Sequence, residues 1–347
     1  MLKKLLFGFL AFCCIAGIGA GVFVYRAKSV KSEFVGDRLF HIDERENVFS
    51  VAKRLESEHL VVSRWYFLWS AWRGGLRGKI HAGDFVIPGK LTSPDVATVF
   101  LVNDGKPKEI TLTFPEGWTA KQMAARLSAN GFDGEGFLAL VEKPLPEMTA
   151  KYPILASLPE GASLEGFLFP DTYTFLLSAT PENILAKMLH NFETRFTTDM
   201  REEAVRQGKG VFQIVTLASI VEREIGTMKQ SAEDIARERG MVSDLFWRRL
   251  ADGHALESDA TVQYARGGEA KIQHSLDDIA VDSPYNTYAN KGLPPGPISN
   301  PGIVSLRAAL YPIANDYYFF LNNPQTGQTF FSKTFEEHVR NKTANGL

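Results

Sequence analysis

Two glutamates close a run of otherwise apolar residues in "LASIVEREIG", residues 217 to 226. On a helical wheel Glu222 lies over the apolar residues of the preceding turns, with Ser219 one turn below it, whereas Glu224 points to nearly the opposite side. Apolar surroundings disfavour a charged carboxyl group and raise its pKa, which a general acid at neutral pH requires. Glu222 is therefore the candidate catalytic acid, and Glu224, beside Arg223, is expected at the surface.

The same pattern fits a purely structural glutamate. A buried carboxylate paired with an arginine such as Arg248 or Arg249, or one at a fraying helix end, would look alike in sequence. Enzymes that cleave glycosidic bonds with two acids hold them about 5 to 9.5 Å apart. Other acids could supply a partner, namely Glu165 and Asp171 in "SLEGFLFPDTY" and Glu257 and Asp259 in "LESDAT". Sequence alone does not give their separations.

Other catalytic classes find little support. "SVAK" at residues 50 to 53 has the Ser-x-x-Lys pattern of penicillin-binding proteins, but the Ser-Asp-Asn and Lys-Thr-Gly companions are missing. The cysteines are Cys13 and Cys14, which leaves no disulfide framework, and no two of the seven histidines lie closer than 18 positions. We therefore expect neither a metal nor another cofactor.

The composition is that of an ordinary globular protein. The 347 residues, 45% hydrophobic and 22% charged, are enough for about two domains. A formal net charge of -2 gives no electrostatic reason to expect nucleic acid as a partner.

The N-terminal region has the pattern of a membrane anchor. Residues 5 to 25 carry no charge, and Lys3, Lys4, Arg26, Lys28 and Lys31 flank them. Such a run spans a bilayer as a helix. A cleaved signal peptide is the alternative, although bulky residues continue the run where a cleavage site would need small ones. We expect a single-pass anchor at residues 1 to 30, with the N-terminus cytoplasmic and the remaining chain outside the inner membrane.

Beyond the anchor, the pattern of apolar residues predicts an α+β protein with a weak internal repeat. Residues 42 to 60 align with residues 114 to 132 at an offset of 72, and each copy combines a strand with helices. Further helices are predicted from residue 211, at about 230 to 251, at 303 to 311 and from Thr334, with a hairpin before the last. Five prolines make residues 283 to 302 irregular.

Four motifs in this order resemble those of the membrane-anchored endolytic murein transglycosylases, the MltG or YceG-like family. They are "EGFLFPDTY", "LASIVEREIG", "LESDATVQYA" and "SPYNTYANKGLPPGPISNPG". The family's "SIVEKE" stands here as "SIVERE", and Ala260 replaces the proline of its Thr-Asp-Pro-Thr. The resemblance implies a LysM-like βα module at residues 38 to 105 and a catalytic domain at 106 to 347.

The resemblance also implies site residues. The catalytic glutamate falls on Glu222, and Asp259, Thr261, Tyr285 and Asn286 match positions expected to line the cleft. Ser219, one helical turn below Glu222, is also expected to bind substrate. Asp259 and the loop at residues 285 to 286 are expected across the cleft from Glu222.

The implied reaction cleaves the MurNAc-GlcNAc bond within nascent glycan strands and leaves 1,6-anhydro ends. The substrate's own C6 hydroxyl is the nucleophile, so orientation replaces a second carboxylate. Implied partners are peptidoglycan, the membrane and penicillin-binding protein synthases. The alternatives are a non-catalytic peptidoglycan-binding scaffold and a muramidase-type hydrolase.

Overall fold

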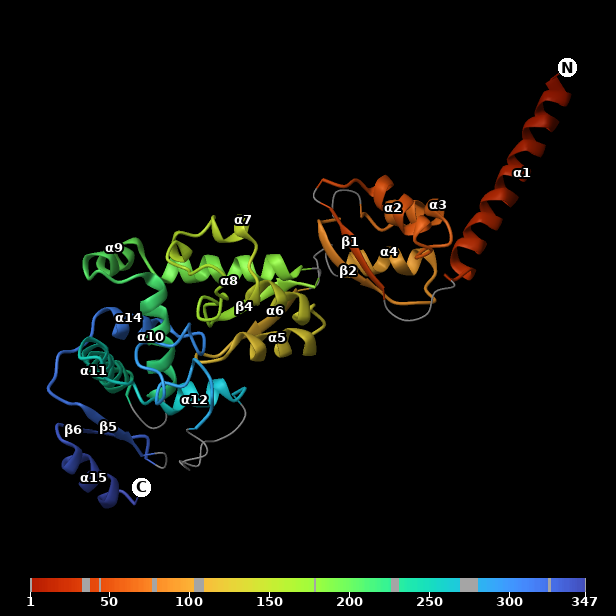
Figure 1. The fold of residues 1–347 in the computed structure, drawn as a ribbon. Coiled ribbons are helices and arrows are strands. Elements are labelled where there is room, and N and C mark those ends of the chain that lie inside the picture. The colour runs from red at the N-terminus through yellow and green to blue at the C-terminus, as the bar shows by residue number, and fades with distance from the viewer. Residues whose placement is uncertain are drawn as a thin grey trace. The chain divides into compact units, whose positions relative to one another are not determined.

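The computed structural model describes residues 2–32, 38–43, 45–76, 80–102, 109–177, 179–225, 231–268, 280–323 and 326–346, and the side chains of residues 2–14, 101–102 and 147 lie outside this description. Helices and small antiparallel sheets make the protein α+β, as the sequence predicts (Figure 1). By internal contacts the chain divides into a first unit, Met1–Thr111 with Thr174–Ser178, and a second, Leu112–Tyr173 with Ala179–Leu347.

The first unit is built around a two-stranded ribbon and short helices. Its elements are α1 (Leu2–Ser29), β1 (Arg38–Ile42), α2 (Val48–Ser57), α3 (Arg64–Arg73), β2 (Gly83–Ile87) and α4 (Ser93–Val102). In the antiparallel ribbon Phe40 lies opposite Phe85, and both rings contact Phe100 of α4. Phe67 of α3 contacts the same ring, so four buried phenylalanines form the centre of this core. The described members of this core all belong to the first unit.

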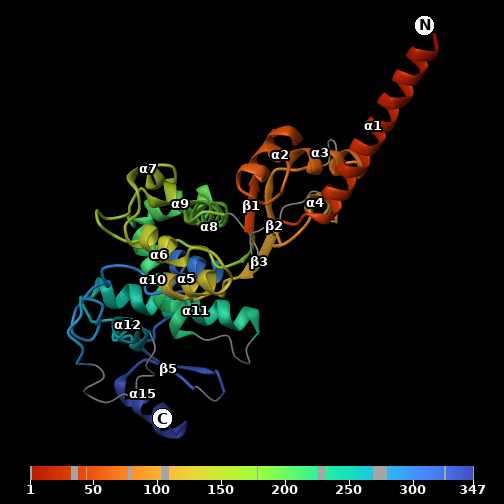
Figure 2. The same cartoon turned by 90° about the vertical axis from the view of Figure 1, so that its right-hand side faces the viewer.

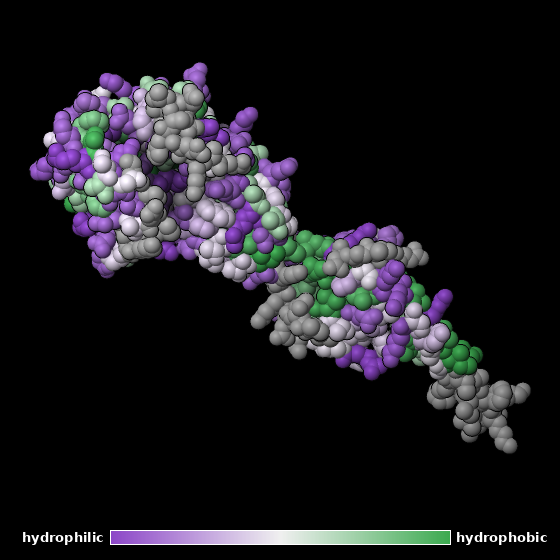
Figure 3. All heavy atoms as spheres, turned by 90° about the horizontal axis from the view of Figure 1, so that it is seen from below, coloured by the Kyte–Doolittle hydropathy of each residue, from purple (hydrophilic) through white to green (hydrophobic). Residues whose placement is uncertain are grey.

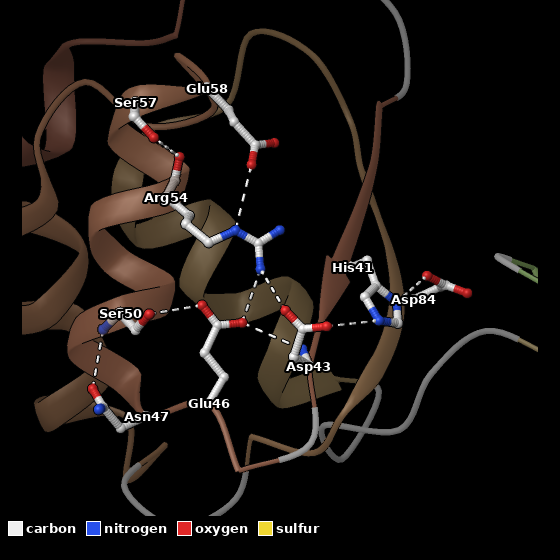
Figure 4. A network of polar contacts seen from close by, with 9 residues as sticks. All are labelled: His41, Asp43, Glu46, Asn47, Ser50, Arg54, Ser57, Glu58 and Asp84. Atoms are coloured by element: carbon white, nitrogen blue, oxygen red, sulfur yellow. Dashed lines mark hydrogen bonds and ion pairs between the residues drawn. The ribbon is translucent and has the colours of Figure 1, made fainter.

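A polar network fixes the turn between β1 and α2 (Figure 4). Asn47 caps α2 by accepting from the amides of Phe49 and Ser50, each at 3.0 Å. Glu46 accepts from the hydroxyl of Ser50 and from Nη1 of Arg54, both at 2.9 Å. Since a capping side chain satisfies amides that the first helical turn leaves unpaired, the network sets where α2 begins.

The described part of α1 carries exposed apolar side chains. Ile15, Ile18 and Val22 are 70, 68 and 53% exposed, and Figure 3 shows hydrophobic residues along this helix. Within the residues that the structure describes, no helix combines the length and apolarity that a membrane crossing needs. The predicted anchor falls in part on residues 2–14, whose side chains lie outside the described set.

From residue 109 the chain repeats the element order of the first unit, a strand, two helices, a strand and a helix, although residues 109–111 and 174–176 of these strands count with the first unit. These are β3 (Glu109–Thr113), α5 (Ala120–Ala129), α6 (Gly134–Glu142), β4 (Thr172–Leu176) and α8 (Pro181–Arg195), with α7 (Pro146–Thr149) and the 3-10 helix η1 (Pro153–Leu155) inserted. α5 begins 72 residues after α2, and their caps, Thr119 and Asn47, have the same spacing. The weak sequence repeat thus has a structural counterpart.

The rest of the second unit surrounds one buried helix. Its elements are α9 (Thr198–Arg206), α10 (Val211–Glu224), α11 (Ala232–Ala251), α12 (Asp259–Ala265), α14 (Ile303–Leu310), β5 (Phe319–Asn322), β6 (Thr329–Ser332) and α15 (Phe335–Ala344). Residues 211, 212 and 214–222 of α10 are all buried, and α10 packs against α11, α12 and α14. Figures 1 and 2 both show α10 among these helices. Residues 283–302 contain neither helix nor strand, as predicted.

Candidate active site

Glu222 forms a buried ion pair with Arg239 of α11. Nη2 of Arg239 donates to Oε1 at 2.6 Å and Nη1 donates to Oε2 at 3.2 Å, while the amide of Gly302 donates to Oε2 at 3.1 Å. The two side chains are 4 and 1% exposed. A carboxylate whose two oxygens both accept from a guanidinium is a stable hydrogen-bond acceptor. A general acid instead needs an oxygen that is free to carry and release a proton. The prediction that Glu222 has apolar surroundings is therefore wrong, because the guanidinium of Arg239 contacts its carboxyl group.

Glu116, in the turn before α5, joins this pair. Its Oε2 lies 3.9 Å from Nη1 of Arg239. Burial raises the pKa of Glu116, the negative charge of Glu222 raises it further, and Arg239 lowers it. Gly302 leaves room for the carboxyl group, since a Cβ at residue 302 would lie 1.8 Å from Oε1 of Glu116. The cluster thus connects four segments of the second unit.

Glu224 lies in a different place, a cleft of about 660 Å³. Its carboxyl group accepts a hydrogen bond from the hydroxyl of Ser258. Burial raises the pKa of Glu224 to about 7; the neighbouring charge of Asp259 adds to this, and the bonds from Ser258 and the Ala260 amide and the charge of Arg223 oppose it. Glu224 is half-buried and lines this cleft rather than lying on the outer surface, so its predicted position is wrong.

Asp259 shares the cleft with Glu224. The hydroxyl of Tyr288 donates to Oδ1 of Asp259 at 2.7 Å, and burial, followed by this bond, raises the pKa of Tyr288. The sequence predicts Asp259 across a cleft from Glu222, whereas the glutamate that lines the cleft with Asp259 is Glu224. Glu224 and Tyr288 are lining residues that the sequence reasoning missed. Tyr288 lies in "SPYNTYANKG", two positions after Asn286. Its place in this motif could have identified it as a candidate lining residue.

Further lining residues of the cleft come from the C-terminal hairpin and α15. The lining there includes Phe319, Phe335, His338 and Lys342. The ring of Phe319 lies 5.9 Å from that of Phe335 and 5.5 Å from that of His338. Arg249 of α11 also lines the cleft and donates to the carbonyls of Leu256 and Tyr318, each at 2.8 Å. Carboxyl groups, basic side chains and aromatic rings therefore line one cleft, a combination typical of small-molecule binding sites.

Three predicted binding residues hold the surrounding backbone instead. Ser219 donates to the carbonyl of Thr216 at 2.7 Å and accepts from the amide of Ile298 at 2.9 Å. Thr261 bonds to Thr287 at 2.8 Å. Asn286 donates to the carbonyl of Val281 at 2.8 Å and accepts from the amide of Tyr288 at 3.0 Å. All three side chains are buried.

Tyr285 lies apart from the cleft described above. Its ring is 5.0 Å from that of Tyr264, and the charge of Glu165 contributes to its raised pKa, after burial. The expectation that the 285–286 loop faces Glu222 across the cleft therefore does not match these contacts. A role in substrate binding for Ser219, Thr261, Tyr285 and Asn286 stays a prediction.

Glu165 is a second buried acid, tied to Asn300. It accepts from the amide of Ala120 at 3.0 Å at both oxygens and from Nδ2 of Asn300 at 2.6 Å. Burial raises the pKa of Glu165 to about 7, and these bonds oppose the shift. Oδ1 of Asn300 accepts from the amides of Gly166 and Leu168 at 2.8 and 3.0 Å. Glu165 and Asn300 thus join "EGFLFPDTY" to the proline-rich loop.

Replacing Gly166 by alanine is expected to lower the free energy of unfolding by about 2–4 kcal/mol, through a left-handed backbone and a clash. Gly166 has a φ of +92°, and a Cβ would lie 2.6 Å from Pro297 and 2.8 Å from Val215. Gly161→Ala is the matched control, because Gly161 has a φ of +76° with nothing within 4 Å of an added Cβ. Urea denaturation followed by circular dichroism measures both, and equal losses would contradict the clash.

The sequence matches that of a known protein family. Residues 40–344 match the model of the YceG-like family. The chain belongs to the YceG-like family. The resemblance drawn from the four motifs is thereby confirmed.

Two relatives of this YceG-like chain are called endolytic murein transglycosylases. The one from Bacillus subtilis is 33% identical over 225 residues, which cover 65% of this chain and 58% of the relative. The one from Streptococcus pneumoniae (serotype 2, strain D39) is 31% identical over 258 residues, covering 68% of this chain and 44% of the relative. The chain thus spans about half the length of the curated relatives it matches.

A solved structure shares the fold. The crystal structure at 2.6 Å of a yceG-like protein from Listeria monocytogenes has a TM-score of 0.58 and 31% sequence identity, covering 89% of this chain and all of that one.

Proposed function

We propose that this protein is an endolytic lytic transglycosylase of peptidoglycan, with Glu224 as its general acid and base. The observation that carries the proposal is a half-buried carboxyl group whose pKa is about 7, lining a cleft of about 660 Å³. A carboxyl group with a pKa near neutral can both give and take a proton at physiological pH. The names of the relatives support the substrate and the reaction class.

The reaction needs one acid acting twice. Glu224 first donates its proton to the glycosidic oxygen, and the bond from C1 of the muramic acid to that oxygen breaks. The C6 hydroxyl of the same sugar then attacks C1 and gives its proton to the Glu224 carboxylate, which restores the acid. Because the nucleophile is part of the substrate, its position replaces the activation of a water molecule.

Asp259 supplies negative charge in the same cleft. The positive charge that develops on the sugar ring in the transition state would be stabilised by a carboxylate held in place. The Tyr288 hydroxyl bond at 2.7 Å fixes the orientation of Asp259. The charge of Asp259 also keeps the pKa of Glu224 raised.

Glu222 is proposed as a structural residue. The resemblance assigns the catalytic glutamate to Glu222, and that assignment is untested. The bidentate contact with Arg239 and the amide bond from Gly302 occupy both of its oxygens. Glu224 has the accessible cleft and the raised pKa that acid catalysis requires.

The site of action is proposed to be the outer face of the inner membrane. Residues 5 to 25 supply an uncharged run for a single-pass anchor, with the N-terminus in the cytoplasm. A catalytic unit held there would meet nascent strands beside the penicillin-binding protein synthases. The module at residues 38 to 105 is proposed to be LysM-like and has a core of its own to support such a role.

Activity is expected to fall as the pH rises through about 7. The general acid must be protonated at the start of the reaction, and the pKa of Glu224 is about 7, so the active form is lost above that value. Asp259→Asn removes a charge that raises this pKa and should move the falling limb of kcat/KM to lower pH. Asp316→Asn, at an exposed residue, is the control. An unmoved limb in Asp259→Asn would contradict the coupling.

Mass spectrometry of the fragments released from isolated glycan strands tests the reaction class. A lytic transglycosylase leaves 1,6-anhydro ends, whereas a hydrolase leaves reducing ends that are one water heavier. Reducing ends as the main product would favour a muramidase-type hydrolase, which could use two of the three carboxyl groups that line the cleft, Glu224, Glu257 and Asp259. Strands left uncut by the full chain would favour a non-catalytic scaffold.

A further inference from the structure

Three tryptophans form a stripe along α3 in the first unit. Trp65, Trp69 and Trp72 are spaced i, i+4 and i+7, which places them on one side of a helix. Trp65 is 58% exposed and Trp72 is 73% exposed. The side that faces the core is occupied by Phe67 and Ala71, which are buried. α3 thus has a second aromatic side, here called the Trp stripe, that the core of the unit does not use.

Two arginines lie over the Trp stripe. The guanidinium of Arg64 is 5.3 Å from the ring of Trp65, and that of Arg73 is 5.2 Å from the ring of Trp69. Arg64 also lies 3.6 Å from Glu56, a pair at the edge of the stripe. Stacked guanidinium groups keep their charge and their outward hydrogen-bond donors, so the surface combines indole rings with positive charge.

The Trp stripe continues onto α1. The ring of Phe23 lies 4.8 Å from that of Tyr66 and 6.2 Å from that of Trp69. Phe23 belongs to the uncharged run of residues 5 to 25, and Arg26 and Lys28 follow it. The end of the proposed anchor therefore meets the stripe within one unit.

We propose that the Trp stripe rests on the headgroup region of an anionic lipid bilayer. Indole rings favour this region because they have an apolar body and a polar N–H, and arginines beside them attract anionic headgroups. Protein interfaces are also enriched in tryptophan and arginine, so the contact between Phe23, in the uncharged run, and Trp69 is the observation that favours lipid here. The inference rests on the proposed anchor, and it assigns the first unit a second contact with the membrane besides α1.

Tryptophan fluorescence in vesicles tests this contact on the full chain. The chain is reconstituted into phosphatidylcholine vesicles with or without phosphatidylglycerol, with lipids brominated near the headgroup end of their acyl chains. Bromine should quench the emission, and Trp65→Phe/Trp72→Phe should lower the quenched fraction about twofold if interfacial indoles carry it. The matched control, Trp118→Phe/Trp247→Phe, removes two tryptophans of the second unit and should not lower it. Arg64→Gln/Arg73→Gln should reduce the dependence on phosphatidylglycerol.

The possible outcomes distinguish a failure of the stripe contact from a failure of the proposed anchor or of the proposed reaction. A chain that does not float with vesicles overturns both the anchor and the stripe contact. Flotation with equal quenching in the wild type and the stripe variant overturns the stripe contact alone. Stripe indoles that stay accessible to aqueous acrylamide in the vesicles also overturn the stripe contact. That result is expected if the partner of the stripe is another protein, which these samples lack. Formation of anhydro ends, measured on the same samples, reports separately on the proposed reaction.

Discussion

Replacing Glu224 by glutamine is expected to lower kcat/KM for strand cleavage by about 10²–10⁴-fold, the usual contribution of a general acid. Glutamine keeps the size of the side chain and an oxygen that can accept from the hydroxyl of Ser258. It cannot give or take the proton that the two steps require. Release of anhydro ends, normalised to folded protein, measures the loss, and an unchanged Tm would show that the fold is intact.

Glu222→Gln is the matched comparison, two residues away on the same helix. If Glu222 is structural, the folded fraction of this variant keeps most of its activity per molecule while its stability falls. The opposite pattern is an active Glu224→Gln and a stable but inactive Glu222→Gln. It would identify Glu222 as the general acid and refute the proposal that Glu224 has this role.

Breaking the ion pair of Glu222 and Arg239 from one side is expected to lower the free energy of unfolding by about 3–5 kcal/mol. Arg239→Met leaves the Glu222 carboxylate buried without its guanidinium. Glu222→Gln leaves the guanidinium with Glu116, at 3.9 Å, in place of the close bidentate pair. The side chains of Glu222 and Arg239 are almost fully buried, so water cannot compensate. Urea denaturation of the full chain, followed by circular dichroism, measures each loss.

The double variant Glu222→Leu/Arg239→Met distinguishes the pair from a general loss of packing. Removing both charges avoids the uncompensated charge, so the double variant should be more stable than Arg239→Met alone. Arg237→Met, on the same helix with a side chain 55% exposed, is the control and should cost little. If the double variant loses as much unfolding free energy as the two single variants together, the broken ion pair is not the cause of the single-variant losses.

Much of the second unit could be predicted from the spacing of its apolar residues. The all-round apolar run from Val211 identified a buried helix, and α10 begins at that residue. Thr334 was predicted to start the last helix, and its side chain caps α15 by accepting from the amide of Glu337. Local patterns suffice in these cases, because a cap or a buried face depends on residues within a few positions.

The site was predicted less well, because its contacts join distant segments. A helical wheel orders side chains around α10 but does not show which neighbour covers each side. Arg239, 17 residues on, lies beside Glu222, and Ser258, 34 residues on, bonds to Glu224. The side that looked apolar in sequence therefore contains a guanidinium, and the side that looked exposed lines the cleft.

The contacts of Arg239 at the end of α10 have a consequence for how the sequence of this protein can vary. Arg239 binds Glu222 and also donates to the carbonyl of Ile225 at 3.3 Å, and both contacts oppose rotation of the last turn of α10 about its axis. The direction of the Glu224 side chain is thereby set by contacts behind the helix. Under the proposed function, substitutions in the hairpin and α15, which line the same cleft, would change which glycan fits without moving the proposed proton donor.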